Sequence, residues 1–156
     1  MSASVFGEGI CTLPGNGSFV RMTWQDNIVD LLDSNLRVTE SLQMFTGPKE
    51  GWGITRNGHT LYVSDGSSQI YTVDAHSFET LGSFTVTMQN GTLVRNLNEL
   101  EFVNGELWAN VFQTNFVLSI NPETGIVQRL IDFRSLIETE KKFNKLNNNR
   151  MKTWDY

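Results

Sequence analysis

Short strands separated by turns are predicted along most of the chain. The signal is strongest over residues 98–112, where apolar residues take alternate positions on both sides of an Asn-Gly pair: Leu100, Phe102, Leu107, Ala109 and Val111. A period of two is typical of strands, and an Asn-Gly pair between two of them predicts a tight β-hairpin. Asn98, Glu99 and Glu101 crowd the start of this hairpin, where strand pairing does not require them, so it is a candidate site.

A longer pattern repeats three times. Residues 28–33, 69–74 and 116–121 are each a predicted strand that ends in Asp or Asn, and another predicted strand follows each. The repeats recur every 40 to 50 residues or so, which is roughly the period of propeller blades. The Asp or Asn would cap the turn between the two outer strands of a blade, because its side chain accepts hydrogen bonds from backbone amides two residues on. We therefore predict an all-β propeller built of four-stranded antiparallel blades.

The two ends of the chain extend this pattern. Residues 5–13 would form the innermost strand of the first blade. We also predict a short helix over residues 135–142, after the last blade. The chain then holds about three blades, which form an incomplete ring.

Three ordered motifs resemble the signatures of plant- and bacterial-type glutaminyl cyclases, also called glutamine cyclotransferases. They are Phe-Gly-Glu-Gly-Ile at residues 6–10, Glu-Gly-Trp-Gly-Ile-Thr at 50–55 with Ser-Asp-Gly-Ser at 64–67, and Asn-Glu-Leu-Glu at 98–101 with Gly-Glu-Leu-Trp-Ala-Asn at 105–110. The resemblance covers roughly residues 5–135 and implies a five-bladed propeller of which this chain would be a truncated member. It fades toward the end, so we expect a partial propeller over residues 1–142 and a divergent tail over 143–156.

Composition narrows the function classes. The 156 residues suit one domain, and the net charge of −5 with no basic stripe before residue 141 argues against nucleic acid as a partner. No apolar run reaches the length of a membrane span. The first residues lack the basic and apolar regions of a signal peptide, which leaves the compartment open, although members of the resembling family are often secretory or periplasmic. Cys11 is the single cysteine, so no intrachain disulfide can form.

The resemblance implies a reaction in which an N-terminal glutamine closes into pyroglutamate and releases ammonia. The α-amine must lose a proton and the departing nitrogen must gain one, and a single carboxyl group can serve both steps. Glu8 stands between two glycines and matches the family glutamate that has this role. Without the resemblance, Glu8 would be interpreted as a solvated loop glutamate.

The resemblance also implies a substrate pocket. Its residues are Phe6, Trp24, Trp52, Asn98 and Phe112. Asn98 would hold the substrate amide or amine, with an Asx-turn as the alternative, and the aromatic residues would form walls, with plain core packing as the alternative. Phe112 stands where many family members have tryptophan, so it keeps a wall but lacks an indole N–H donor. Two further family contributions, a Phe-x-Gln segment and a lysine, have no counterpart in these residues.

A metal ion is not required for the implied reaction. Glu50 and Glu99 are candidates to line the channel, where a structural calcium ion would suit hard oxygen ligands in a complete propeller. His59 and His76 both fall in predicted turns and Cys11 stands alone, which argues against zinc.

The expected partners are peptides or proteins with an N-terminal glutamine, with self-association through exposed blade faces in addition. The alternative function is a non-catalytic propeller module that binds protein or peptide, because fold alone does not decide function. The two hypotheses differ in whether Glu8, Trp52 and Asn98 surround one pocket.

Overall fold

The computed structural model describes residues 6–15 and 17–146, in which three four-stranded antiparallel sheets precede one helix. The first sheet holds β1 (Gly7–Thr12), β2 (Phe19–Thr23), β3 (Ile28–Leu32) and β4 (Val38–Gln43). The second holds β5 (Ile54–Asn57), β6 (Thr60–Ser64), β7 (Gln69–Asp74) and β8 (Thr80–Thr85). The third holds β9 (Leu97–Val103), β10 (Glu106–Val111), β11 (Phe116–Ile120) and β12 (Val127–Asp132), and α1 (Arg134–Leu146) follows.

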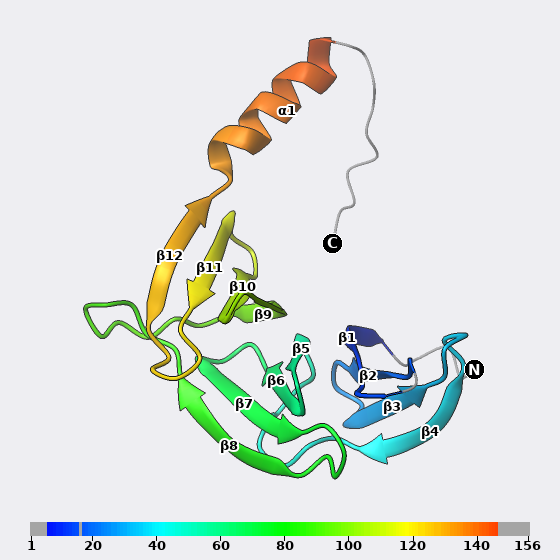
Figure 1. Cartoon of the computed structure of the whole chain (residues 1–156). Helices are drawn as coiled ribbons and strands as arrows, with labels where there is room; N and C mark the ends of the chain where they lie inside the picture. The colour runs from blue at the N-terminus through cyan, green and yellow to red at the C-terminus, as the bar shows by residue number, and fades with distance from the viewer. Residues whose placement is uncertain (1–5, 16, 147–156) are drawn as a thin grey trace.

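The sheets are blades arranged side by side in an open arc (Figure 1). Within each blade the strands run in sequence order from the inside of the arc, where β1, β5 and β9 lie, to the outside, where β4, β8 and β12 lie. The predicted all-β class and the incomplete three-blade propeller are thus confirmed, as is the innermost position of the first strand.

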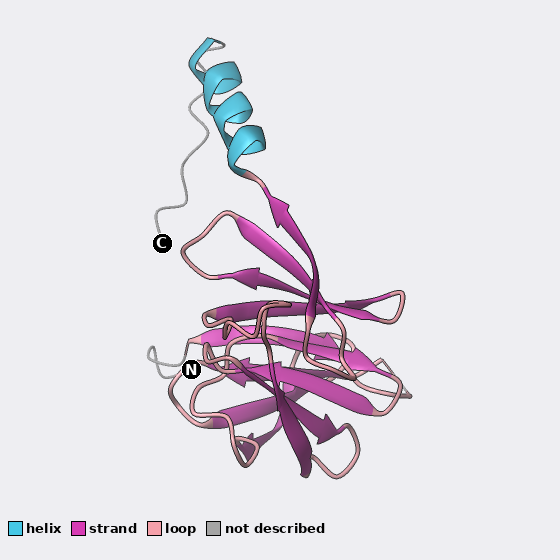
Figure 2. Cartoon of the chain, turned by 90° about the vertical axis from the view of Figure 1, so that its left-hand side faces the viewer, coloured by secondary structure: helices cyan, strands magenta, loops and turns pink. Residues whose placement is uncertain are grey.

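The helix projects away from the third sheet (Figure 2). It begins one residue before the predicted segment and continues to Leu146, so it passes the point at which the divergent tail was expected to begin. Residues 147–156 of that tail lie outside the described residues.

The turns follow the predicted chemistry. The Oδ1 atoms of Asp33, Asp74 and Asn121 each accept hydrogen bonds from two backbone amides of the following turn, at 2.8–3.1 Å. At the Asn-Gly hairpin both central residues have positive φ, 52° for Asn104 and 84° for Gly105. Such angles match the right-handed twist of the flanking strands, so local sequence determines these turns.

Two apolar clusters hold the three blades together. The cluster between the first and second sheets contains Val20, Met22, Val29, Met44, Phe45, Ile54, Leu61, Val63, Val73 and Ala75. The cluster between the second and third contains Ile70, Val86, Leu97, Leu100, Leu107, Ala109, Leu118, Ile120 and Val127. The middle sheet serves both because successive side chains of a strand point to opposite faces: Leu61 faces the first cluster and Tyr62 packs on the second.

The inner strands approach so closely that only glycine fits between them. The Gly9 amide donates to the Trp52 carbonyl at 2.8 Å, and a Cβ on Gly9 would lie 2.7 Å from the Ile54 nitrogen. A Cβ on Gly53 would lie 2.7 Å from the Glu99 Cα. These glycines therefore bring β1, β5 and β9 into backbone contact at one end of the channel.

The outward face of each terminal sheet carries an ion pair. Arg21 lies between core residues of β2 and so points to the outer face of the first sheet, where it pairs with Asp30. Ser41 Oγ donates to the same carboxylate at 2.6 Å. On the outer face of the third sheet Arg129 pairs with Glu106.

Candidate active site

Glu8, Trp52 and Asn98 come from three successive blades and meet at one end of the inner strands. Glu8 lies in β1 next to Gly9, whose amide is bonded to the Trp52 carbonyl. Asn98 lies in β9, where its backbone carbonyl accepts a hydrogen bond from Ser64 Oγ at 2.7 Å. The same hydroxyl accepts from the Gly53 amide at 2.8 Å. The backbone segments that carry the three residues thus lie beside one another.

Four aromatic residues continue this site across all three blades. Phe6 packs edge-on against Trp24, with ring centroids 6.5 Å apart, and Trp52 packs edge-on against Phe112 at 5.4 Å. Glu50 joins the two pairs, because its Oε2 accepts from the Trp24 indole at 2.8 Å and from the Trp52 indole at 2.9 Å. We call these four residues the aromatic row. Phe6, Trp24 and Phe112 are 58%, 41% and 41% exposed, so the row presents open rings to solvent.

The half-buried ring of Trp52 rests on Gly66. That glycine has a positive φ of 75°, and a Cβ there would lie 2.6 Å from the indole. The glycines on either side of Trp52 pack against neighbouring blades. Gly51 packs against Met22 and Gly53 against the backbone of β9, so both serve close packing between blades.

Carboxylates from two blades lie near the same end of the channel. Partial burial raises the pKa of Glu8 above its ordinary value. Crowding by protein atoms raises the pKa of Glu99 to about 7, with a further contribution from the charges of Glu8 and Glu101. Glu99 keeps solvent access on its open side. The pKa of Glu99 lies near neutral pH, where a carboxyl group can both hold and release a proton, as general acid–base catalysis requires.

Two asparagines flank these carboxylates. Asn98 is half-buried, and no hydrogen bond within the described part of the chain engages its side-chain amide. The register between β9 and β10 shifts between Ala109 and Val111, so Asn98 and Glu99 together oppose Asn110 across a β-bulge. Asn110 Oδ1 is buried without a partner. Sequence reasoning did not single out Asn110, although it ends the third motif as an amide within an apolar strand.

Metal ligands do not gather in the described residues, where no three His, Cys, Asp or Glu side chains could hold an ion. Burial raises the pKa of Cys11 to about 12, so this thiol stays protonated. His59 and His76 stack on each other in two turns, with Nδ1 and Nε2 3.0 Å apart.

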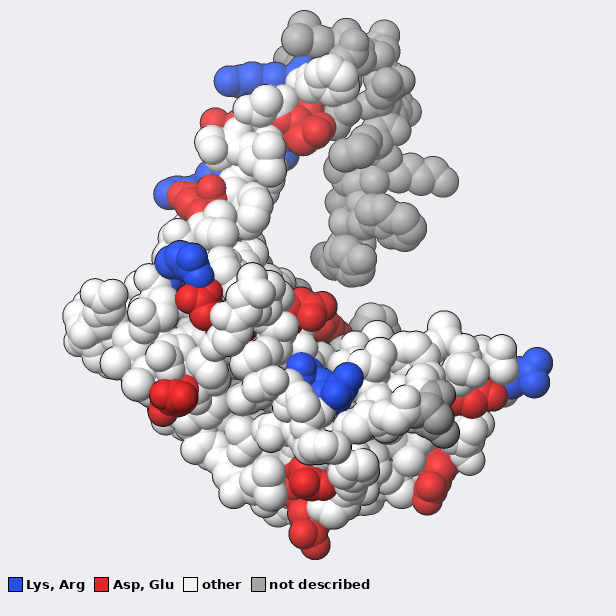
Figure 3. Space-filling view, viewed as in Figure 1, with Lys and Arg blue, Asp and Glu red and all other residues white. Residues whose placement is uncertain are grey.

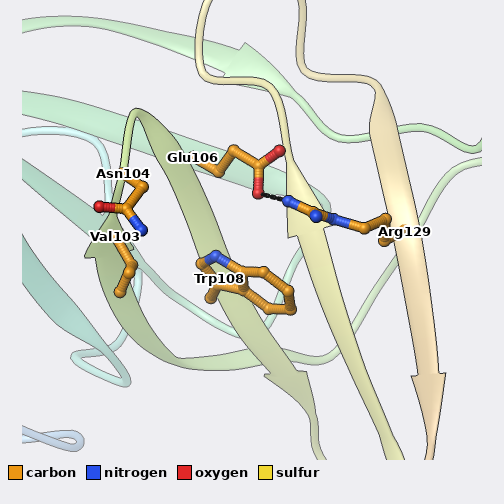
Figure 4. Close-up of a pocket in the computed structure, with 5 residues that line it drawn as sticks. All are labelled: Val103, Asn104, Glu106, Trp108 and Arg129. Carbon is orange, nitrogen blue, oxygen red and sulfur yellow. Dashed lines mark hydrogen bonds and ion pairs between the residues drawn. The ribbon is translucent and has the colours of Figure 1, made fainter.

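A separate hollow of about 440 Å³ opens on the outer face of the third sheet (Figure 4). It is lined by Val103, Asn104, Glu106, Trp108 and Arg129. The Arg129 guanidinium carbon lies 5.2 Å from the Trp108 ring centroid. Val103 and Asn98 stand at opposite ends of β9, so this hollow is distinct from the site at the channel end.

The charged surface shows no single-sign patch on the face seen in Figure 3, where Lys and Arg alternate with Asp and Glu along the projecting helix. Among the described residues no helix is long and apolar enough to cross a membrane.

Known proteins share both the sequence and this fold. A model of the glutamine cyclotransferase family matches residues 1–150. A curated Arabidopsis thaliana protein named glutaminyl-peptide cyclotransferase is 37% identical over 126 residues, which make up 80% of this chain and 38% of that protein. The crystal structure of Myxococcus xanthus glutaminyl cyclase matches with a TM-score of 0.79 and 27% identity, over 90% of this chain and 59% of that one.

A more distant match is informative about the fold alone. Saccharomyces cerevisiae Sqt1 matches with a TM-score of 0.55 and 13% identity, over 80% of this chain and 35% of that one. This chain thus spans less than two thirds of the length of each of these relatives. Because the family match covers nearly every residue and the curated relative shares more than a third of the aligned residues, the chain belongs to the glutamine cyclotransferase family.

Proposed function

We propose that this chain contributes the site of a glutaminyl-peptide cyclotransferase, which converts the N-terminal glutamine of a peptide or protein to pyroglutamate and releases ammonia. The observation that carries the proposal is the meeting of Glu8, Trp52 and Asn98 at one end of the inner strands. Family membership supports the same chemistry.

In the proposed mechanism Glu8 moves the protons. Its carboxylate accepts a proton as the substrate α-amine attacks the side-chain amide carbon, and the new C–N bond closes a five-membered ring. Glu8 then returns the proton to the departing nitrogen, which leaves as ammonia when the old C–N bond breaks. The raised pKa of Glu8 supports this role, because partial burial makes its carboxylate a readier proton acceptor than that of an ordinary glutamate.

The surrounding residues would hold the substrate. The Asn98 amide has no partner within the described structure, so its N–H groups are available to the developing oxyanion or to the substrate amide. The aromatic row would form the wall that binds the glutamine beside Glu8 and Asn98, in the substrate and in the transition state alike. No metal ion takes part in this mechanism, and calcium in the channel of a complete ring would be structural.

The test is a chimera in which residues 6–133 replace the matching blades of Myxococcus xanthus glutaminyl cyclase, so that the rest of the ring is present. We expect ammonia release from a peptide with N-terminal glutamine, and Glu8→Gln should lower kcat by ~10²–10⁴-fold. Glu40→Gln, an exposed glutamate of β4, is the matched control. A chimera that unfolds cooperatively but releases no ammonia, or equal rates with and without Glu8, would contradict the proposal.

A further inference from the structure

We infer that Glu50 is a positioning residue that holds Trp24 and Trp52 as one unit in the wall of the substrate pocket. The inference rests on the proposed function for the meaning of that pocket, but its structural part stands on the contacts alone. Trp24 follows β2 in the first blade, whereas Trp52 precedes β5 in the second. No shared strand or turn therefore couples the positions of the two rings.

Three side chains converge on the Glu50 carboxylate. Oε2 accepts from both indoles, and Oε1 accepts from the Gln25 amide at 3.0 Å. The backbone adds a further link, because the Gly51 amide donates to the Trp24 carbonyl at 3.0 Å. Hydrogen bonds to an ionised acceptor are roughly twice as strong as neutral ones, so this carboxylate fixes both rings across the boundary between two blades.

The arrangement also determines how the rings can meet a substrate. Both indole N–H donors are already used by Glu50, so Trp24 and Trp52 offer only ring faces and edges. Ring faces attract cations, and the substrate carries an α-ammonium before it reacts. Phenylalanine in place of tryptophan at position 112 therefore fits a wall whose members do not donate hydrogen bonds to the substrate.

The first test reads the two indoles directly. With ¹⁵N-labelled tryptophan, the four tryptophans of the chain give at most four indole N–H signals. Trp24→Phe, Trp52→Phe and Trp108→Phe assign the signals of those three residues. As pH falls, both signals should shift together with one midpoint below 4.5, because the indole hydrogen bonds hold the pKa of Glu50 below its ordinary value. Glu50→Gln should abolish the shared shift, and Glu40→Gln should leave it unchanged. Two indole signals that titrate with separate midpoints would overturn the inference. A shared shift that persists in Glu50→Gln would also overturn it.

The second test connects the wall to the substrate in the chimera described above. A wall that contacts ground and transition states equally affects binding alone, so Glu50→Ala should raise KM roughly 10- to 100-fold and leave kcat nearly unchanged. Glu50→Gln keeps one acceptor oxygen and should recover part of the loss. A fall in kcat with KM unchanged would contradict the positioning role. If the chimera is inactive while the indole signals still titrate together, the proposed function fails and the Glu50 contact remains.

Discussion

The buried interfaces between blades and the free faces of the terminal blades are built from different chemistry. Each buried interface is an apolar cluster in which most side chains have no solvent exposure. Each free face instead carries an arginine–carboxylate pair, Arg21 with Asp30 and Arg129 with Glu106. Exposed apolar residues such as Ile10 and Val103 flank these pairs.

This difference bears on the expected self-association through exposed blade faces. The ion pairs are well solvated by water, whereas burial of the exposed apolar residues against another surface would be favourable. Self-association through these faces therefore stays a prediction, and we expect it to involve the apolar residues beside the ion pairs. The four predictions below test the contrast, in order of decreasing effect.

The largest effect is expected where inner strands touch. Gly53→Ala would place a Cβ 2.7 Å from the Glu99 Cα, and backbone cannot yield as a flexible side chain can. We expect a loss of roughly 3 kcal/mol or more in the free energy of unfolding, at the upper end of overpacking effects. Gly82→Ala is the control, because the nearest atom to its Cβ is 3.7 Å away. Urea unfolding measures both, and an equal effect would contradict the packing role of Gly53.

On the free face of the first blade, Asp30→Ala should cost about 1–3 kcal/mol. Asp30 is 5% exposed and accepts from both Arg21 and Ser41, so its loss leaves these two partly buried hydrogen bonds without an acceptor. Thermal unfolding followed by circular dichroism gives the value. No change in Tm would mean that this face is not organised by the pair.

The equivalent change on the third blade should be weaker. The Arg129 and Glu106 side chains are 58% and 28% exposed, and exposed pairs contribute little to stability because water screens them. Arg129→Ala is therefore expected to lower the free energy of unfolding by less than Asp30→Ala does. The same urea titration compares them, and a larger loss for Arg129→Ala would reverse the order predicted from exposure.

The smallest effect concerns Glu99 and pH. Its pKa is about 7 in the folded chain and 4.5 is the ordinary value, so the folded state favours the protonated form. Stability from this group is fully present below pH 4.5 and is lost as pH rises to about 7. Glu99→Gln should remove this pH-dependent loss. At pH 8 it should raise the free energy of unfolding by at most ~1 kcal/mol, because solvent exposure screens the Glu99 charge. Stability measured from pH 5 to 8 checks this, and parallel curves would contradict it.

Much of the fold could be predicted from local sequence. The alternation around the Asn-Gly pair and the Asp or Asn at each blade turn act within a few residues, and the structure shows them as hydrogen bonds of those same turns. The innermost position of β1 followed from the order of the strands. The site residues could be named from motifs, because each motif lies on an inner strand or beside one.

Other features depend on contacts between blades and had no local signal. Glu50 joins Trp24, 26 positions away, only because two blades pack at a fixed register. The β-bulge that sets Asn98 and Glu99 against Asn110 depends on pairing between two strands. The tight packing of Gly53 on β9 likewise required the third blade to be in place.

The most direct test of the account asks where a glutamine peptide binds, using the assigned indole signals of the chain itself. Trp24 and Trp52 report on the channel end, and Trp108 reports on the hollow of the free face. A peptide with a free N-terminal glutamine should shift the Trp24 and Trp52 signals and leave Trp108 unchanged, whereas the same peptide with an acetylated N-terminus should shift none. A shift at Trp108 alone would contradict the account and favour a binding module that uses its outer face.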